Sequence, residues 1–531
     1  MAVLRGNNHA YTVVLLSTWC LLIIACTANT NWFNHGGDLS NRRYAEGEVL
    51  INPLTVSKLR LKWKFFAGKD ITATPAIADG IIYFPSWNGH LYAVRGYDGS
   101  LVWDKDLGEL TGLAGTGLYV NVTVSRATPT VVHDLLITGI FGPAIVIAVK
   151  RSTGELVWMT QLDPRPRTQI TMSGTFYRGY FYVGISSLEN FQSPPLCCTF
   201  RGSMVKLDAR SGALVWQTYT IPDNGGKLGG YSGAAVWGSS PSIDIFRNLV
   251  YVGTGQLYTA PPEVVECQKA QTNKTAPTQQ CIDPNVHYDS ILAFDMDSGD
   301  IRWFQRLEGY DVFSVACLDP TSPYCPPGPN LDADFGEAPM LLSAFIKGRK
   351  RDLAVAVQKS GYAWALDRDT GDIIWSTIAG PGGLEGGGVW GSATDGRTVY
   401  TNIVNTNRAN FTLAPSAEVS TAGGWVALDA STGRILWTTA DPTNDTATAH
   451  GPVSLAFGVL FAGSVSSQGP FYAMDSKTGK ILWSYDTSAT VYGGASVSNG
   501  CIYLGNGYTV GLAKFKPTWT GGTSLYAFCI A

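Results

Sequence analysis

The chain has 531 residues, of which 45% are hydrophobic and 15% are charged, so it is long enough to bury a large core. Its 60 glycines and 27 prolines are typical of a turn-rich, all-β chain. The formal net charge is −3 and the chain has no basic run, so electrostatics give no support to binding of nucleic acid.

The N-terminus has the pattern of a secretory signal peptide. Arg5 is followed by a short apolar core at 13–26 and then by small residues, and we expect cleavage near Ala28. This core is short for a membrane span, although a retained anchor is the alternative. Residues 1–28 are therefore predicted to be removed and 29–531 to form one secreted domain, in the apoplast or cell wall if the source is a plant. Four sequons fit a glycosylated protein: Asn121, Asn273, Asn410 and Asn444.

After a polar lead-in at Trp32–Tyr44, one frame recurs along the chain: Ala, five residues, Gly, three residues, Trp. Each copy predicts an alternating strand, a turn in which Gly takes a positive φ, and a short strand that ends in Trp. Seven hairpins that cannot bury their own faces indicate a repeat architecture. The copies are Ala93/Gly99/Trp103, Ala148/Gly154/Trp158, Lys206/Gly212/Trp216, Ala293/Gly299/Trp303, Ala365/Gly371/Trp375, Ala427/Gly433/Trp437 and Ala473/Gly479/Trp483.

The two ends of the chain supply an eighth copy. Residues 59–66 (LRLKWKFF) are a Trp strand without its first half, and 524–530 (SLYAFCI) are a first half without its Trp strand. Joined in space, they complete a ring that has no open sheet edge. The uneven spacing of the Trp residues suits four-stranded blades with inserted loops. The sequence therefore predicts an all-β fold, an eight-bladed β-propeller closed by its N- and C-terminal strands.

Three long stretches break the repeat, at 187–200, 255–289 and 309–338, and rigid blades carry function on such loops. Removal of the signal peptide leaves eight cysteines, an even number, which in an exported chain favours disulfides. A metal site is the alternative, but no C-x-x-C or Cys/His spacing supports it. Local spacing suggests the pairs Cys197–Cys198, Cys267–Cys281, Cys317–Cys325 and Cys501–Cys529.

The frame AxDxxTGxxxW resembles the tryptophan-docking motif of the alcohol dehydrogenases that depend on pyrroloquinoline quinone (PQQ), nearest the polyvinyl-alcohol-dehydrogenase-like branch found in plants. The lead-in, with Trp32, Gly37-Asp38 and Arg43-Tyr44, is similar to the opening of that family. The resemblance implies oxidation of an alcohol, with PQQ in the central funnel and Ca²⁺ holding it. A carboxylate base would take the hydroxyl proton as hydride passes to the quinone.

The resemblance also implies a metal site and a catalytic base. GISSLE (184–189) is similar to a small-residue run that ends in a Ca²⁺-ligating Glu, which assigns Ser187 to the cofactor and Glu189 to the metal. GTGQLY is similar to a GTGN segment whose Asn binds Ca²⁺, and Gln256 here carries an amide oxygen one methylene further out. Asp311, which lies close before an aromatic residue, is the candidate base and a third metal ligand. Its alternative role is that of a turn-forming Asp.

Further residues match contacts of the cofactor. Arg201 precedes a Gly, as in the family, although an insertion separates it from the metal segment. Trp237 matches the aromatic floor of the cofactor site. Cys197–Cys198 resembles a vicinal disulfide that covers PQQ in relatives, although its placement differs and a local loop clamp is the alternative. Lys359 matches a cation that contacts the quinone oxygens, where negative charge develops.

Two functions follow from these patterns. The first is a secreted PQQ- and Ca²⁺-dependent dehydrogenase for a small or polymeric alcohol. It would pass electrons to an external acceptor, because no C-x-x-C-H haem motif follows the repeats. The alternative is a cofactor-less propeller that binds a carbohydrate, a wall polymer or another protein. Asp332, Asp334 and Glu337 are either substrate or metal contacts or only loop acids.

Overall fold

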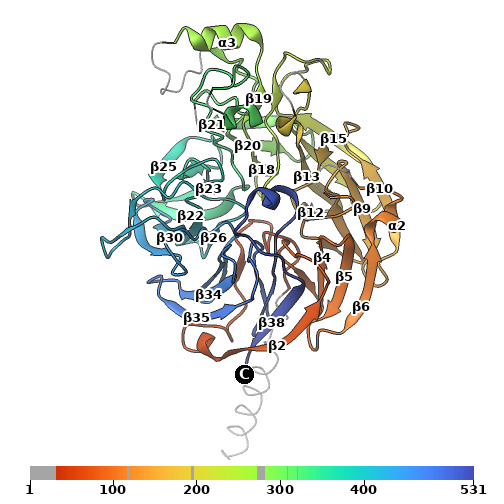
Figure 1. Cartoon of the computed structure of the whole chain (residues 1–531), viewed down its shortest axis with the longest axis vertical. Coiled ribbons are helices and arrows are strands. Elements are labelled where there is room, and N and C mark those ends of the chain that lie inside the picture. Colours follow the sequence, from red (N-terminus) through yellow and green to blue (C-terminus); the bar gives the residue numbers. More distant parts are fainter. Residues whose placement is uncertain (1–30, 116–119, 193–195, 272–280, 308, 320) are drawn as a thin grey trace, which may run out of the picture.

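The computed structural model describes residues 31–531 apart from 116–119, 193–195, 272–280, 308 and 320. The predicted signal peptide and the sequon at Asn273 lie outside the described residues. Eight four-stranded antiparallel sheets surround a central axis, as Figure 1 shows, which confirms the predicted eight-bladed propeller. Within the described part of the chain, no helix has both the length and the apolar character needed to cross a membrane.

Each blade is a meander whose first strand lies nearest the axis. Blades 1 to 4 are β3 (Ala76–Ala78), β4 (Ile81–Pro85), β5 (His90–Arg95) and β6 (Leu101–Asp106); β7 (Thr130–Val132), β8 (Leu135–Gly139), β9 (Ile145–Lys150) and β10 (Leu156–Gln161); β12 (Thr175–Tyr177), β13 (Tyr180–Ser187), β14 (Ser203–Asp208) and β15 (Leu214–Tyr219); and β17 (Ser242–Asp244), β18 (Leu249–Gly253), β20 (Ser290–Asp295) and β21 (Ile301–Arg306).

The second half of the ring repeats this plan. Blades 5 to 8 are β22 (Met340–Ile346), β23 (Arg349–Val357), β24 (Tyr362–Asp367) and β25 (Ile373–Ile378); β26 (Ala393–Thr394), β27 (Thr398–Ile403), β30 (Gly424–Asp429) and β31 (Ile435–Ala440); β32 (Ser454–Ala456), β33 (Val459–Gly463), β34 (Pro470–Asp475) and β35 (Ile481–Asp486); and β36 (Ser496–Ser498), β37 (Cys501–Gly505), β38 (Ser524–Ile530) and β2 (Leu59–Phe66).

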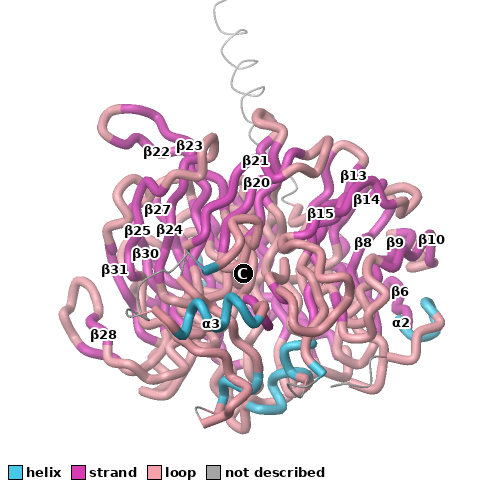
Figure 2. The backbone as a smooth tube through the Cα atoms, turned by 90° about the horizontal axis from the view of Figure 1, so that it is seen from above, coloured by secondary structure: helices cyan, strands magenta, loops and turns pink. Residues whose placement is uncertain are grey.

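Short elements decorate the blades. The helical ones are α2 (Leu107–Thr111), α3 (Pro262–Lys269), η1 (Val56–Lys58), η2 (Glu189–Phe191), η5 (Val315–Leu318) and η6 (Gly511–Phe515). The short strands are β1 (Tyr44–Ala45), β11 (Thr168–Gln169), the pair β16 (Ser232–Gly233) and β19 (Leu257–Thr259), and the pair β28 (Phe411–Thr412) and β29 (Val419–Ser420). Figure 1 shows α3 at the rim of the ring, and Figure 2 shows it among the loops rather than among the blade strands.

The ring is closed by both ends of the chain, as predicted. The N-terminal strand β2 pairs antiparallel with the C-terminal strand β38. The first strands of successive blades contact one another all the way round, and β36 of blade 8 contacts β3 of blade 1. Cys501 and Cys529 lie opposite each other on β37 and β38 and form a disulfide. The other three predicted disulfides are also present.

Tryptophan docking joins each blade to the next. In all eight outer strands the Trp indole N–H donates to a backbone carbonyl of the following blade, for example Trp375 to Ala430 at 3.0 Å. The frame glycines take φ between 71° and 79°, as expected. A Cβ on any of the seven would fall 2.5–2.8 Å from a ring atom of the docked Trp. The glycine therefore serves both the turn and the close approach of the indole.

The lead-in before β2 crosses the axis and contacts the first strand of one blade after another. Its backbone forms hydrogen bonds with the first strands of blades 1, 2, 4, 5 and 6. The bonded pairs are Ile77 with Trp32, Val131 with Phe33, Ile243 with Leu39, Leu341 with Ser40, and Thr394 with Arg42. A sixth bond joins Leu455 of blade 7 to Arg43. The segment thus bridges the blades from inside the ring, a role that its polar sequence did not predict.

Two buried charges lie where this lead-in meets the ring. The fully buried Arg43 donates to the Val453 carbonyl at 2.6 Å, to Ser454 Oγ at 3.0 Å and to the His35 carbonyl. Burial lowers the pKa of Arg43 to about 9, while Glu337 opposes this effect. Glu337 accepts hydrogen bonds from Val357 N at 2.7 Å and from the Ser392 hydroxyl at 2.9 Å. Its pKa is raised to about 7 by burial, against those hydrogen bonds.

The docking geometry predicts the effect of adding one methyl group. Gly433 and Gly396 both have positive φ, but a Cβ on Gly433 meets the Trp375 ring at 2.5 Å, whereas one on Gly396 meets nothing within 4 Å. We expect Gly396→Ala to lower the free energy of unfolding by about 1 kcal/mol. Gly433→Ala should cost about 1–3 kcal/mol more, because the indole must shift. Urea unfolding of both variants checks this, and equal losses would show that docking adds nothing.

Glu337 predicts a pH dependence of stability. Because its folded pKa lies above the unfolded value of about 4.3, the folded state binds more protons, and the free energy of unfolding falls as pH rises from about 5 to 7. Glu337→Gln keeps an amide oxygen for Val357 and removes the titration. We expect the fall, roughly 1 kcal/mol per pH unit, to flatten in this variant. Denaturant unfolding at three pH values measures both slopes, and parallel slopes would contradict the assignment.

Candidate active site

A cavity of about 410 Å³ opens among the loops that connect the inner ends of the blades. This volume lies in the range of small-molecule and cofactor sites. Most of the wall is apolar or aromatic, and a few polar groups interrupt it. The predicted site residues on this wall are Ser187, Trp237, Gln256 and Lys359, together with the two acids of undecided role, Asp332 and Asp334.

Trp237, the predicted floor for a flat ligand, lines the cavity. Its ring lies edge-on to Trp390 at 5.0 Å between centroids, and Lys359 Nζ lies 5.5 Å from its centroid. Its buried indole N–H has no hydrogen-bond partner among the described residues. Trp237 therefore offers the cavity a planar face next to a cation and an unused donor.

Lys359 is held by two carboxylates. Its Nζ lies 3.1 Å from Asp332 Oδ2 and 3.1 Å from Asp334 Oδ2. Burial opposes the charge of Lys359, but both carboxylates outweigh it and raise its pKa. Burial also raises the pKa of Asp332 to about 8, an effect that Lys359 only partly offsets. Asp334 Oδ1 accepts the backbone N–H of Gln256 at 2.7 Å, so the pair of acids ties blade 4 to blade 5 at the cavity wall.

Asp311, the expected base, is not among the residues that line the cavity. Its Oδ2 accepts the Ala333 N–H at 2.7 Å, and burial raises its pKa to about 6. The peptide that follows it pairs with Leu257 in a parallel bridge. Phe313 and Val315, which follow Asp311 closely, do line the cavity, so the loop reaches the wall there while the Asp311 carboxylate is bound to the Ala333 amide.

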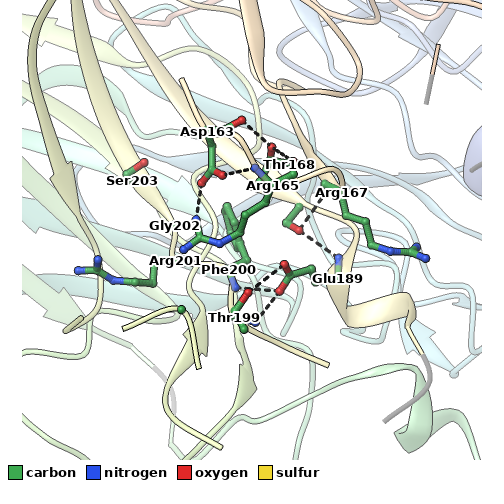
Figure 3. A network of polar contacts seen from close by, with 12 residues as sticks. Asp163, Arg165, Arg167, Thr168, Glu189, Thr199, Phe200, Arg201, Gly202 and Ser203 are labelled. Carbon is green, nitrogen blue, oxygen red and sulfur yellow. Dashed lines mark hydrogen bonds and ion pairs between the residues drawn. The ribbon is translucent and has the colours of Figure 1, made fainter. Parts of the chain in front are cut away.

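Glu189 and Arg201 also serve the backbone rather than the cavity (Figure 3). The Glu189 carboxylate accepts the amides of Thr199 at 2.6 Å and Phe200 at 2.8 Å. Arg201 points away from Glu189 (Figure 3), donates to the Ile221 carbonyl at 3.0 Å and lies over the ring of Tyr219. Both side chains thus clamp the inserted loop to blade 3.

The disulfide Cys197–Cys198 is buried in the core of blades 2 and 3, where it packs near Phe200 and Tyr258. Neither cysteine is part of the cavity wall. Ser187 does line the cavity, and its hydroxyl donates to the Arg167 carbonyl at 3.3 Å.

The predicted metal ligands do not converge. Of Glu189, Gln256 and Asp311, only Gln256 lines the cavity. Within the described residues, no group of three or more His, Cys, Asp or Glu side chains is placed to hold a metal ion. This arrangement does not fit the Ca²⁺ site that the resemblance implies, because that ion takes six to eight oxygen ligands.

The repeat register identifies residues that the motif comparison missed. Counted back four residues from the first strand of each blade, the positions are Thr72, Arg126, Thr171, Gly238, Gly336, Val389, His450 and Tyr492. All six that carry a side chain line either this cavity or a small one beside it on the axis. Arg126 is the most informative, because its guanidinium lies 4.2 Å above the centroid of Trp390. A cation held flat on an aromatic wall suits the carboxylate of a ligand.

Comparisons with known proteins agree with this fold. A family model described as the outer membrane protein assembly factor BamB matches residues 54–183 and 419–515, less than half of the chain. A polyvinylalcohol dehydrogenase of a Pseudomonas species is 29% identical over 388 residues, which cover 70% of this chain and 55% of the relative. Another, from a Sphingopyxis species, is 29% identical over 464 residues and 82% of this chain. This chain covers 64% of that second relative, so it spans little more than half the length of both.

Solved structures extend the likeness to the whole ring. The quinohemoprotein alcohol dehydrogenase ADHIIG of Pseudomonas putida superposes with a TM-score of 0.73 at 18% identity, covering 96% of this chain and 82% of that one. At this identity the likeness shows the fold alone. The two sequence relatives described above are bacterial, and the plant branch stays a prediction. The chain is thus similar in sequence to polyvinylalcohol and quinohemoprotein alcohol dehydrogenases, and its fold is like that of a quinohemoprotein alcohol dehydrogenase.

Proposed function

We propose that the protein is a PQQ-dependent dehydrogenase that oxidises an alcohol. The observation that supports this best is the junction of Trp237, Lys359, Asp332 and Asp334 on one cavity wall. A scaffold without a cofactor would need no cation held between two buried carboxylates beside a flat aromatic face. The named homologues support the same reaction class.

The residues present fit the quinone. The unpartnered N–H and planar ring of Trp237 suit one face of an aromatic cofactor, and Arg126 suits a carboxylate at its edge. When bound, PQQ supplies the acceptor for the hydride that leaves the alcohol carbon. Lys359 would donate to the oxygens on which negative charge develops. The apolar wall would exclude water from the reacting groups.

Asp334 is the proposed general base, in place of Asp311. It lines the cavity and is hydrogen-bonded to Lys359, so a substrate hydroxyl placed beside this pair would have an acceptor and a cation at hand. Asp332, whose pKa is raised by burial, is the weaker candidate. The electrons would pass to an external acceptor. Secretion is also proposed, because four disulfides are typical of an oxidising compartment.

Substitution of the two aspartates tests the assignment. We expect Asp334→Asn to lower kcat about 10²- to 10⁴-fold, the usual contribution of a general base, while PQQ still binds. Asp311→Asn, which also neutralises a buried acid but leaves the cavity wall intact, is the matched control and should keep kcat within tenfold. Dye-linked oxidation of simple alcohols by PQQ-loaded protein provides the rates. The reverse order of the two effects would return the role of base to Asp311.

The role of Glu189 gives a separate prediction. Because its carboxylate binds two backbone amides, Glu189→Gln should lower the free energy of unfolding by about 1–2 kcal/mol. The affinity for PQQ should stay unchanged, whether Ca²⁺ or a chelator is present. Thermal unfolding and an absorbance titration with PQQ measure the two quantities. A large, Ca²⁺-dependent loss of PQQ affinity would instead establish Glu189 as a metal ligand.

A further inference from the structure

The inner hairpin of blade 5 is longer than the inner hairpins of the other blades. Its first strand β22 has seven residues and its second strand β23 has nine, whereas the first strands of the other seven blades have two or three. The third strand β24 pairs with β23 only from Leu353 onward, so residues 344–351 continue beyond the sheet as a two-stranded ribbon. Figure 2 shows this hairpin standing out from the ring on the side away from α3.

The tip of the hairpin lies at the end of the axis opposite the cavity. The cavity is lined by residues that precede a first strand or follow a second one, such as Trp390 and Lys359. The turn between these two strands therefore lies at the other end. In blade 5 it consists of Lys347 (φ 50°) and Gly348 (φ 76°), as in a two-residue turn with positive φ at both positions. A Cβ on Gly348 would meet nothing within 4 Å, so the tip stands in open space.

The hairpin carries a local excess of positive charge. Four of the five residues at 347–351 are cationic, a short basic cluster that was missed in the sequence. All four side chains are exposed, and they are Lys347, Arg349, Lys350 and Arg351. Within the described residues only Arg351 has an ion-pair partner, Asp367 at 3.2 Å. Three cations at the tip are thus available to a partner of negative charge.

Exposed aromatic side chains accompany these cations. Phe345 is 73% exposed and lies directly across the ribbon from Lys350, so the two side chains share one face. Phe246, in the corresponding turn of blade 4, is 92% exposed. The next residue, Arg247, forms an ion pair with Asp352 at the base of the ribbon at 3.1 Å, which ties the two turns together. Two phenyl rings that stand in water beside unpaired cations indicate an interaction surface.

Further apolar side chains are exposed at this end of the ring. Phe457 occupies the turn of blade 7. Leu50, from the segment before β2, is exposed over the turn of blade 8, where a Cβ on Gly500 would lie 3.1 Å from its Cδ1. The turns of blades 2, 3 and 6 carry charges of both signs on Asp134, Arg178, Asp395 and Arg397. The excess of positive charge therefore belongs to the blade 5 hairpin, and apolar groups surround it.

We propose that this end of the propeller docks on a membrane surface that contains anionic lipids, with the β22–β23 hairpin as its main contact. Lys347, Arg349 and Lys350 bind the lipid headgroups, and Phe345 and Phe246 enter the boundary of the acyl chains. A soluble polyanion would satisfy the cations but offers no apolar phase to the phenyl rings, so the rings favour a lipid surface. The protein docks without spanning the membrane, and the cavity at the opposite end stays open to solution.

Co-sedimentation of the full chain with vesicles tests the docking. The vesicles contain phosphatidylcholine and phosphatidylserine in equal parts, or phosphatidylcholine alone. We expect binding to the anionic vesicles that salt weakens, and at least about tenfold weaker binding to the neutral ones. Joint replacement of Lys347, Arg349 and Lys350 by Gln should lower the affinity on the order of 10²-fold, because each cation contributes about fivefold. Phe345→Ser should lower it about tenfold.

The matched control removes three other exposed cations, by Arg60→Gln, Lys62→Gln and Lys64→Gln on the outer strand β2. Arg60 donates to backbone carbonyls, and Lys62 and Lys64 each lie 5.0 Å from the centroid of a tyrosine ring. The change in net charge equals that of the hairpin variant, but we expect affinity within about twofold of the wild type, because these cations lie away from the docking end. Thermal unfolding checks that all variants are folded.

Three results would overturn the proposal. They are equal binding to neutral and anionic vesicles, an equal loss of affinity in the two triple variants, and binding of soluble polygalacturonate that matches vesicle binding and is unaffected by Phe345→Ser. The last result would assign the hairpin to an acidic polysaccharide.

The docking does not depend on the proposed dehydrogenase. Vesicle-bound protein should bind PQQ as tightly as free protein, and loss of PQQ binding on vesicles alone would contradict the outward-facing cavity. Protein that docks but never binds PQQ would refute the dehydrogenase and keep the docking surface.

Discussion

The structure depends on the contact between an indole ring and a glycine, repeated around the circle. Seven of the eight docked Trp rings lie on a turn of the next blade, where a side chain on the glycine would collide with the ring, and all eight indole N–H groups are bound to the next blade's backbone. The contact fixes the angle between blades, so eight copies close a ring of set diameter. The last contact of this kind joins Trp483 to the carbonyl of Leu59, which comes from the start of the chain. Closure therefore makes the fold cooperative across its two ends.

The site is a consequence of this geometry. When the blades are set at equal angles, the residues just before each first strand point toward one axis, whatever their chemistry. Arg126, Tyr492 and His450 reach the cavity in this way, although they are far apart in the sequence. The lead-in occupies the axis on the inside of the first strands and buries Arg43 there. Residues of different chemistry can therefore occupy the positions before the first strands without a change in the ring.

The fold could be predicted almost completely from the sequence, because it depends on short-range patterns. The frame of Ala, Gly and Trp specifies strand, turn and docking contact within eleven residues. The pairing of 59–66 with 524–530 follows because the first segment is a Trp strand without its preceding strand and the second is that preceding strand without a Trp strand. The disulfides were predictable for the same reason, since their partners are close in sequence or on adjacent strands. Of the predicted site residues, Trp237 and Lys359 line the cavity, and each adjoins a regular strand.

The remaining site residues could not be predicted because they lie in or beside insertions. The loop around 190–200 turns the Glu189 carboxylate onto the amides of Thr199 and Phe200, and no local pattern shows this. The loop at 309–338 carries both Asp311 and Asp334, and only Asp334 lines the cavity, so a choice between them needed the path of the chain. His450 and Arg126 carry no motif and become visible only when the repeats are aligned by their first strands.

The central claim is that this cavity holds a quinone on the face of Trp237. An equilibrium titration of PQQ into wild-type protein and into Trp237→Leu, followed by quenching of tryptophan fluorescence, tests it most directly. The account predicts saturable binding of one PQQ per chain to the wild type and at least tenfold weaker binding to the variant, in which the aromatic face is lost. Folded wild-type protein that binds no PQQ, or a variant that binds it equally well, would contradict the account.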